Sequence, residues 1–407
     1  VVVPRYRVSL AALAVLPLAG TMTRAQATPP ELRAVRELRI DAEASDLAVV
    51  NWMLIARDGT IAVAQSQDHR IRFFSVRGES LGTFGREGAG PGEFRAMTLH
   101  GWLGDTLWVG DFNTRRTTLI SPARELVRIV PWPPTLSIPS PNGGPSGRLL
   151  AMPLWAIYAD GSSLHFGLIA EPVPEGMPGI APMLRVKADS TLERIVGWRP
   201  AGPDCSVAVE IPRGSAVASI PYCDEPRFAV APDGSRIAFA IVERTGARTE
   251  HFRVVVLGSR GDTLLNRRYP FEPVAISKRV ADSVRASRAA AASGPFADAY
   301  RKAYQSLPVP ESYTPFERVL VGVDGTVWIE RMPNAPQRLW LVLDARGNPL
   351  GTVRVPRNVV LRAVARDRFW ATERDDNDLE SIVRYRFEVA DRAGDAPDAV
   401  PGLKSLH

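Results

Sequence analysis

The sequence predicts an all-β protein, a six-bladed β-propeller with four-stranded blades. The first observation behind this prediction is a repeated pattern, a turn followed by an alternating strand, which is clearest at Asp58-Gly59 and the residues after it. Asp-Gly is a strong hairpin signal because Gly adopts a positive φ without steric cost, and alternation is typical of a half-buried strand. The pattern begins at Asp58, Asp105, Asp160, Asp233, Asp324 and Asp367.

The second observation is the number of strands that each repeat contains. In the first repeat, alternating or apolar runs predict strands over 47–55, 60–64, 71–76 and 80–84. The second repeat continues the pattern over 97–102, 107–110, 117–120 and 126–130, and the fifth over 316–323, 327–330, 339–343 and 350–355. Four strands per repeat are typical of propeller blades.

The third observation concerns the two ends of the repeat array. Residues 32–40 alternate apolar and charged side chains but have no hairpin partner of their own, and residues 382–389 give a third strand after the last turn, with no fourth. An N-terminal strand that completes the last blade would leave no open sheet edge. We therefore expect 32–40 to pair with 382–389 and to close the ring.

The two widest gaps between successive turns indicate insertions. One holds Cys205 and Cys223, and the other, 277–307, is predicted to be a helical hairpin between blades four and five. In its second half Phe296, Tyr300 and Tyr304 fall on one stripe with a helical period. This stripe can pack on a propeller face or blade edge, or the hairpin can serve as a ligand lid or partner-docking element.

Residues 1–27 are typical of a signal peptide. Arg5 and Arg7 precede an apolar run over 8–20, and Ala25-Gln26-Ala27 follows it. The run is too short to span a membrane. These features predict a secreted or periplasmic protein with no membrane span in its mature form, the propeller over 28–392 and a flexible C-terminal tail over 393–407.

Cysteine content and charge narrow the possibilities further. Cys205 and Cys223 are the only cysteines, which in an exported chain favours a disulfide over free thiols or a metal site. The formal net charge of +6 includes arginines of the signal peptide, and Arg alternates with Asp and Glu elsewhere. An interspersed surface of this kind is ordinary for a solvated protein, so we predict no nucleic-acid partner and a monomer.

One stretch resembles a known repeat family. Phe84-Gly85 leads through Gly90-Pro91-Gly92-Glu93-Phe94 to an inner strand, followed by Val109-Gly110-Asp111 and Asn113-Thr114-Arg115. This order is similar to the NHL-type repeat and, more narrowly, to exported bacterial six-bladed β-propeller proteins; blade one departs from it with Gln65 where the family has Asp. The resemblance implies a ring whose loops on one face bind proteins, peptides or RNA or, in lyase and lactonase relatives, a metal and a substrate.

His100 is the candidate for a catalytic role, because it lies in the predicted innermost strand of blade two. His100 and Asp111 are also the candidate metal ligands. No cofactor is predicted, with Ca²⁺ or Zn²⁺ in the central channel as the alternative. For His100 the other interpretation is a structural histidine, and for Asp111 and Asn113 it is a hairpin held by backbone hydrogen bonds.

The candidate binding residues lie near blade junctions and in loops, and the aromatic and Arg side chains among them are types that are frequent in binding hot spots. They are His69, Asp111, Asn113, Trp198, Glu330 and Arg331. The loops 65–69, 85–94, 111–114, 330–332 and 373–378 are expected to converge on the face of the ring that bears the hairpin loops and the channel mouth. The sequence thus favours an exported non-catalytic binding protein, whose protein, peptide or small-molecule ligand binds at the channel-mouth face. The alternative is a metal-assisted lyase or hydrolase, lactonase-like or amidating-lyase-like, with a site in the central channel.

Overall fold

The structure is a computed structural model that describes residues 29–389 except 135, 144–145, 171–174, 180, 213 and 334–335. The predicted signal peptide, 1–27, and the predicted tail, 393–407, lie outside these residues. The described chain is all-β apart from two α-helices and a short 3-10 helix. No helix in the described chain is long and apolar enough to cross a membrane.

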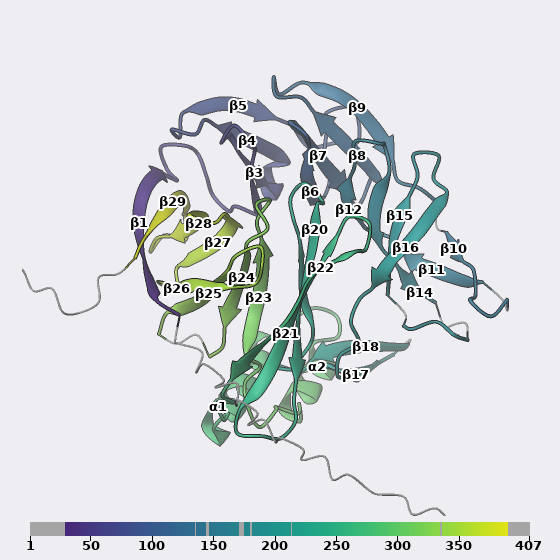
Figure 1. Ribbon diagram of the computed structural model, residues 1–407, viewed down its shortest axis with the longest axis vertical. Helices are drawn as coiled ribbons and strands as arrows, with labels where there is room; N and C mark the ends of the chain where they lie inside the picture. Colours follow the sequence, from purple (N-terminus) through teal and green to yellow (C-terminus); the bar gives the residue numbers. More distant parts are fainter. Residues whose placement is uncertain are drawn as a thin grey trace, which may run out of the picture.

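Small antiparallel sheets are arranged around a common centre, as in a β-propeller (Figure 1). Within the described residues, four sheets have four strands in chain order. They are β2(Trp52–Ile55) to β5(Ser80–Phe84) with β3(Ile61–Gln65) and β4(Arg70–Phe74); β6(Met97–Leu103), β7(Thr106–Asp111), β8(Arg116–Ile120) and β9(Leu126–Pro131); β12(Leu154–Ile157), β13(Ser163–Phe166), β15(Pro182–Val186) and β16(Leu192–Trp198); and β19(Arg227–Val230), β20(Arg236–Glu243), β21(Glu250–Gly258) and β22(Thr263–Phe271).

A fifth sheet has eight strands and contains both ends of the repeat array. Its order is β23(Phe316–Val321), β24(Val327–Arg331), β25(Arg338–Leu343), β26(Pro349–Val355), β1(Glu31–Ile40), β29(Glu380–Val389), β28(Arg368–Arg374) and β27(Val359–Val364). β1 pairs antiparallel with β29 from Leu32↔Val389 to Ile40↔Ile382, which is the pairing that the sequence predicts. Its parallel pairing with β26 covers two positions, so β1 bridges two four-stranded units.

The repeated turns explain why the strands follow one another so regularly. At Asp58, Asp160, Asp233 and Asp324 the Asp Oδ1 accepts the backbone N–H of the residue two positions on, with N···O distances of 2.8 Å at Thr60, 2.9 Å at Ser162, 3.0 Å at Ser235 and 3.0 Å at Thr326. Gly59 takes a φ of 86°, which residues with a side chain rarely adopt. A side chain therefore fixes these four turns locally.

The first predicted inner strand, 47–55, is shorter than expected. Leu47 and Val50 are buried, but β2 begins only at Trp52. The Val50 N–H donates to Glu380 Oε2 at 3.0 Å, so a side chain takes the place of a strand partner at this position. Residues 52–55 are strand as predicted, whereas 47–51 contribute side chains to the core without forming a strand.

The hydrophobic core lies between neighbouring sheets. Ile71 and Phe73 of one sheet pack with Met97 and Val109 of the next, around the buried Phe94 that precedes β6. Likewise the side chains of β19–β22 pack with those of β23–β25. Burial between sheets explains why several strands are apolar on both faces.

Two insertions pack against each other, and we call them together the cap. The first is the hairpin β17(Ser206–Ile211) and β18(Gly214–Ser219), closed by the predicted disulfide Cys205–Cys223 with a Cα–Cα distance of 5.6 Å. The second is the helix pair α1(Lys278–Ala291) and α2(Ala297–Gln305), which lies between β22 and β23 in the chain. A further small sheet comprises β10(Ser137–Ile138), β11(Gly147–Ala151) and β14(Leu168–Ile169).

The helical stripe has the β17–β18 hairpin as its partner. Tyr300 and Tyr304 pack on a small core formed by Val209, Ala218 and Leu307. Phe296 is the N-cap residue of α2 and is 39% exposed, so it does not belong to the buried stripe. Thus the two insertions supply apolar faces for each other.

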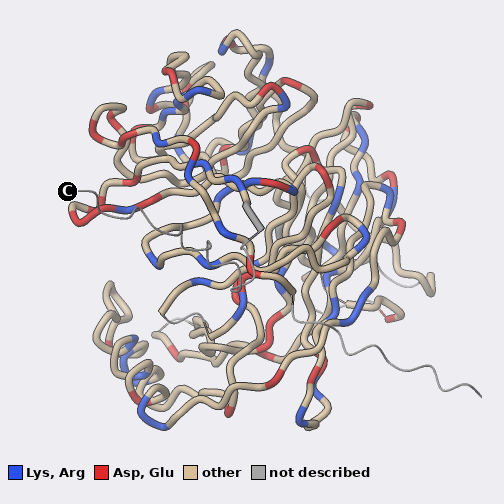
Figure 2. The backbone as a smooth tube through the Cα atoms, turned by 60° about the vertical axis from the view of Figure 1, so that its left-hand side comes forward, with Lys and Arg blue, Asp and Glu red and all other residues tan. Residues whose placement is uncertain are grey.

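Charged side chains are spread over the chain rather than gathered by sign. Figure 2 shows Lys and Arg alternating with Asp and Glu along the turns and strands. Many of these side chains form ion pairs, for example Arg36 and Arg39 with Glu373 at 3.1 Å each. Such exposed pairs stabilise a fold only weakly.

Candidate functional site

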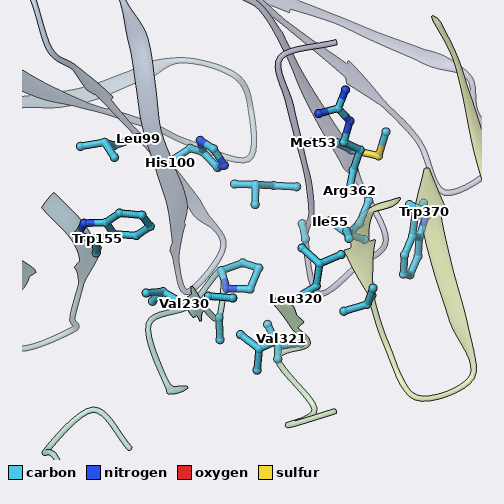
Figure 3. A pocket seen from close by; sticks show the side chains of 18 of the residues that line it. Met53, Ile55, Leu99, His100, Trp155, Val230, Leu320, Val321, Arg362 and Trp370 are labelled. Carbon is cyan, nitrogen blue, oxygen red and sulfur yellow. The ribbon is translucent and has the colours of Figure 1, made fainter. Parts of the chain in front are cut away.

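A cavity of about 450 Å³ lies among the first strands of the four-stranded units (Figure 3). We call it the channel cavity. Its walls come mainly from β2, β6, β12, β19, β23 and β27, with Trp370 of β28, and include Met53, Ile55, Leu99, His100, Trp155, Val230, Leu320, Val321, Arg362 and Trp370. β2, β6, β12 and β19 belong to four different sheets, and β23 and β27 lie at the two ends of the eight-stranded sheet. Only the assembled ring therefore forms the cavity.

The walls are mainly aliphatic and aromatic. The polar side chains among them are Arg57, Thr98, His100 and Arg362, and no Asp or Glu of the described chain lines the cavity. Pockets that bind small molecules in proteins are usually apolar in this way, with few polar groups that fix the ligand's orientation. The channel cavity has that composition.

His100 is half-buried in the wall and stacks on Trp52, with a distance of 4.4 Å between ring centroids and an interplanar angle of 18°. Within the described residues, its Nδ1 has no hydrogen-bond partner. Burial lowers the pKa of the imidazole to about 4. His100 is therefore neutral at pH 7.

Arg362 carries a positive charge into the same wall. Its Nε donates to Thr372 Oγ1 at 3.3 Å, and its Nη2 lies 3.5 Å from Glu380 Oε2. Glu380 is itself fixed by Arg374 Nη2 at 2.9 Å. Burial lowers the pKa of the Arg362 guanidinium, and the Glu380 carboxylate opposes that shift.

The side chains of the channel cavity do not fit a metal ion. Ca²⁺ requires several oxygen ligands and Zn²⁺ usually four ligands from His, Cys, Asp or Glu. Among the described residues that line the cavity, His100 is the only His, Cys, Asp or Glu. In the whole described chain, no group of three or more such residues could hold a metal ion. The predicted partner, Asp111, is buried elsewhere and accepts the backbone N–H of Arg95 at 2.6 Å and of Asn113 and Thr114 at 3.0 Å each.

The other predicted binding residues are spread over several elements. His69 follows the 3-10 helix Ser66–Asp68 with a φ of 50°, and Trp198 ends β16 at the edge of the core around Ile138. The Arg331 guanidinium lies over the Phe252 ring at 5.3 Å, and burial lowers its pKa. None of them lines the channel cavity.

Glu330 lies in a strand, as the predicted strand 327–330 has it, and not in the predicted loop 330–332. Glu330 lies in β24, opposite Trp340 of β25, and its side chain is fully buried. Its Oε1 accepts a hydrogen bond from Arg338 Nη1 at 2.7 Å. The strand continues to Arg331 because β25 offers it backbone partners to that point.

Arg362 was not predicted as a site residue, although the sequence contains a signal for it. His100, Trp155 and Arg362 each stand five residues before the Asp of their repeat's turn, at Asp105, Asp160 and Asp367. Because the repeats are equivalent around the ring, equal spacing from the turn places side chains at a similar depth in the channel. Aligning the repeats on this Asp would have found the polar pair.

The imidazoles of His100 and His165 predict a loss of stability in mild acid. His in an unfolded chain has a pKa near 6.5, whereas burial lowers the pKa of His100 and of His165 to about 4. Between these values the unfolded chain binds more protons, so the free energy of unfolding falls as the pH decreases from about 6.5 to about 4. We expect about 1–2 kcal/mol to be lost per imidazole between pH 7 and pH 5.

Urea unfolding at both pH values measures this loss. In the His100→Gln variant the difference between pH 7 and pH 5 should shrink by about 1 kcal/mol. The His251→Gln variant leaves both imidazoles in place and controls for the substitution itself. An unchanged pH dependence in His100→Gln would show that the His100 imidazole is not protonated on unfolding.

The fold and the cavity define the class of the protein, a β-propeller with a ligand-sized cavity at the centre of its ring. No protein-family model matches the sequence, and no curated protein matches it. Among solved structures it is similar to a DUF4221 family member from Bacteroides vulgatus, with 12% identity, 89% of this chain and 99% of that chain covered, and a TM-score of 0.47.

Two further solved structures are similar over most of their length. They are an exported protein from Bacteroides fragilis, with 10% identity, coverage of 88% and 95% and a TM-score of 0.41, and virginiamycin B lyase from Staphylococcus aureus, with 9% identity, coverage of 87% and 98% and a TM-score of 0.36. These values are too low to transfer a function to this chain.

Proposed function

We propose that this chain is an exported six-bladed β-propeller that binds a ligand in the channel without catalysing a reaction on it. The four separate four-stranded sheets and the two halves of the eight-stranded sheet supply the six blades. β1 completes the last blade, and α1 and α2 stand between the fourth and the fifth. The propeller would occupy 28–392.

The observation that carries the binding function is the composition of the channel cavity. Its volume of about 450 Å³ lies in the range of small-molecule pockets, and its apolar wall holds two side chains suited to orienting a ligand, His100 and Arg362. A ligand with an aliphatic or aromatic body and one anionic or hydrogen-bond-accepting group matches this wall. A peptide side chain or terminus from a protein partner could supply the same chemistry.

The side chains of the same wall fit catalysis less well than binding. A catalytic His is normally oriented by a hydrogen bond to its second ring nitrogen, and a metal-assisted lyase or hydrolase needs several ligands. Within the described residues, His100 Nδ1 lacks such a bond and the cavity lacks the ligands. These features favour binding over a lactonase-like or amidating-lyase-like reaction.

Export is supported by the disulfide Cys205–Cys223, because disulfides persist in oxidising compartments such as the periplasm or the extracellular space. The absence of a nucleic-acid partner is part of this proposal, and the interspersed Lys, Arg, Asp and Glu along the backbone in Figure 2 support it. The monomeric state remains a prediction.

Fluorescence titration with 1-anilinonaphthalene-8-sulfonate, an aromatic anion, tests the proposed site. Val230 lines the channel cavity, and Val230→Trp should fill part of it and weaken binding at least about tenfold, the scale of one lost hot-spot contact. Val127→Trp on β9 makes the same substitution at a side chain that is 52% exposed and should leave the affinity unchanged. Near-UV circular dichroism verifies that each variant is folded.

Equal affinities in the two variants would contradict a channel site.

Metal analysis separates binding from the enzymatic alternative. A stoichiometric metal that is lost in His100→Ala would overturn the non-catalytic proposal.

A further inference from the structure

A second cavity, of about 670 Å³, lies between the cap and the beginnings of β19 and β23. We call it the cap cavity. Its polar walls include Tyr222, Glu225, Arg227, Arg288, Thr314 and Glu317. Arg227 and Glu317 stand at the start of β19 and β23, whereas Val230 and Val321 at the other ends of these strands line the channel cavity. The two cavities therefore use opposite ends of the same strands.

The walls of the cap cavity are fixed by covalent and tertiary contacts. The disulfide Cys205–Cys223 lines it and ties the β17–β18 hairpin to the segment before β19. On the helical side, Arg288 of α1 donates to the backbone carbonyl of Ser219. The cavity is thus enclosed by elements that hold each other in place.

Several donor groups in these walls are unused. Thr314 is only 3% exposed. Within the described chain, neither its hydroxyl nor Arg227 Nε has a hydrogen-bond partner. Arg288, which also lines the cavity, donates from Nη1 to the backbone carbonyl of Ser219, and its guanidinium carries further N–H groups. A buried polar group without a partner destabilises a fold. Unpaired donors beside a cavity therefore indicate that the cavity holds a group that accepts hydrogen bonds.

We propose that the cap cavity binds the carboxylate of a zwitterionic amino acid or short peptide, held by Arg227, Arg288 and Thr314. Guanidinium groups suit carboxylates because their N–H groups form a fork that matches two oxygens. The hydroxyl of Thr314 adds a further donor. This site is separate from the channel cavity and does not depend on the function proposed for it.

The charges around the cavity select a zwitterion over a dianion. Asp204, Glu225 and Glu317 line the same walls as the two arginines. Glu225 is paired on both sides, with Arg199 at 3.0 Å and with Arg227 at 2.7 Å. Three carboxylates near two guanidinium groups repel a ligand with two negative charges, such as phosphate, and favour a carboxylate whose molecule also carries a positive ammonium group.

Calorimetric titration with alanyl-alanine tests this inference, with N-acetyl-alaninamide and inorganic phosphate as comparisons. We expect alanyl-alanine to bind and the uncharged peptide and phosphate not to bind. Thr314→Val removes the unused hydroxyl with little change in shape and should weaken binding about tenfold, the low end for one hydrogen bond to a charged group. Arg227→Gln should weaken it more, about tenfold to a hundredfold.

Two matched variants serve as controls. Thr118→Val on β8 removes another buried hydroxyl that lacks a partner in the described chain but does not line the cavity. Arg236→Gln removes a guanidinium from the same sheet as Arg227, beside the carbonyl of Val323. Both should bind alanyl-alanine as the unmodified chain does.

The result that overturns the inference is an absence of heat with alanyl-alanine at millimolar concentration, or equal binding of phosphate or of the uncharged peptide. Unchanged affinity in Thr314→Val also overturns it. That variant keeps the Arg227–Glu225 pair, so it gives a decision even where Arg227→Gln is poorly folded.

Discussion

Replacing Glu330 with Ala is expected to lower the free energy of unfolding by about 3 kcal/mol, because it leaves partly buried guanidinium charge without its carboxylate. Glu330 is fully buried, with Arg338 Nη1 at 2.7 Å and Arg318 Nη1 at 3.9 Å. Burial already lowers the pKa of Arg318, and the carboxylate opposes that shift. The loss lies at the low end for a broken buried pair since the side chains of Arg318 and Arg338 remain 32% and 22% exposed.

Urea unfolding at pH 7 measures the effect, and Glu373→Ala is the matched control. Glu373 also contacts two arginines, Arg36 and Arg39, but these pairs lie at the surface, so its replacement should cost at most about 1 kcal/mol. If the two variants lost the same stability, burial of Glu330 would not be what makes its charge important. Replacing Arg338 as well as Glu330 should recover part of the loss, because it removes one of the unpaired charges.

The sequence was sufficient to predict the features of the fold that depend on local chemistry. The Asp turns are recognisable because one side chain bonds the backbone two residues later, as Asp58 does with Thr60. The pairing of β1 with β29 was also predictable, since each was a strand with a missing neighbour in a fold of four-stranded repeats.

Features that depend on distant partners were harder to predict. The β17–β18 hairpin was not predicted as strands, because the turn between Ile211 and Gly214 has Pro212 in place of an Asp-Gly pair. The burial of Glu330 follows from Arg338 and Arg318 on neighbouring strands, which no pattern within β24 reveals.

The candidate sites likewise include residues that local sequence identifies and residues that depend on distant partners. Strand position identified His100 as an inner-wall residue, because an inner strand can be recognised from its place before the turn. The cap cavity could not be predicted, since Arg227, Arg288 and Thr314 come from three segments that meet only when the cap is assembled. For that reason most of the predicted binding residues lie outside both cavities, as His69, Asp111 and Trp198 do.

Removing β1 is expected to cost about 5 kcal/mol or more, comparable with the whole stability of many domains. β1 covers β29 along its length, and its buried ends belong to two different cores. Leu32 packs with Trp328 and Val353, while Ile40 packs with Met53 and Phe74. Its loss would expose both apolar surfaces and leave β29 as an open edge, which promotes aggregation.

A chain that begins at Asp41 should therefore melt far below one that begins at residue 28, and it should lose near-UV circular dichroism at 37 °C. Because the missing contacts are those of one strand, a synthetic peptide of residues 29–40 should restore part of the spectrum, whereas a peptide of the same composition in scrambled order should not. An equal melting temperature for the two chains would show that β1 lies on the ring without closing it. Restoration by the native peptide alone would indicate that β29 needs this particular register, Leu32↔Val389 to Ile40↔Ile382, to complete the last four-stranded unit.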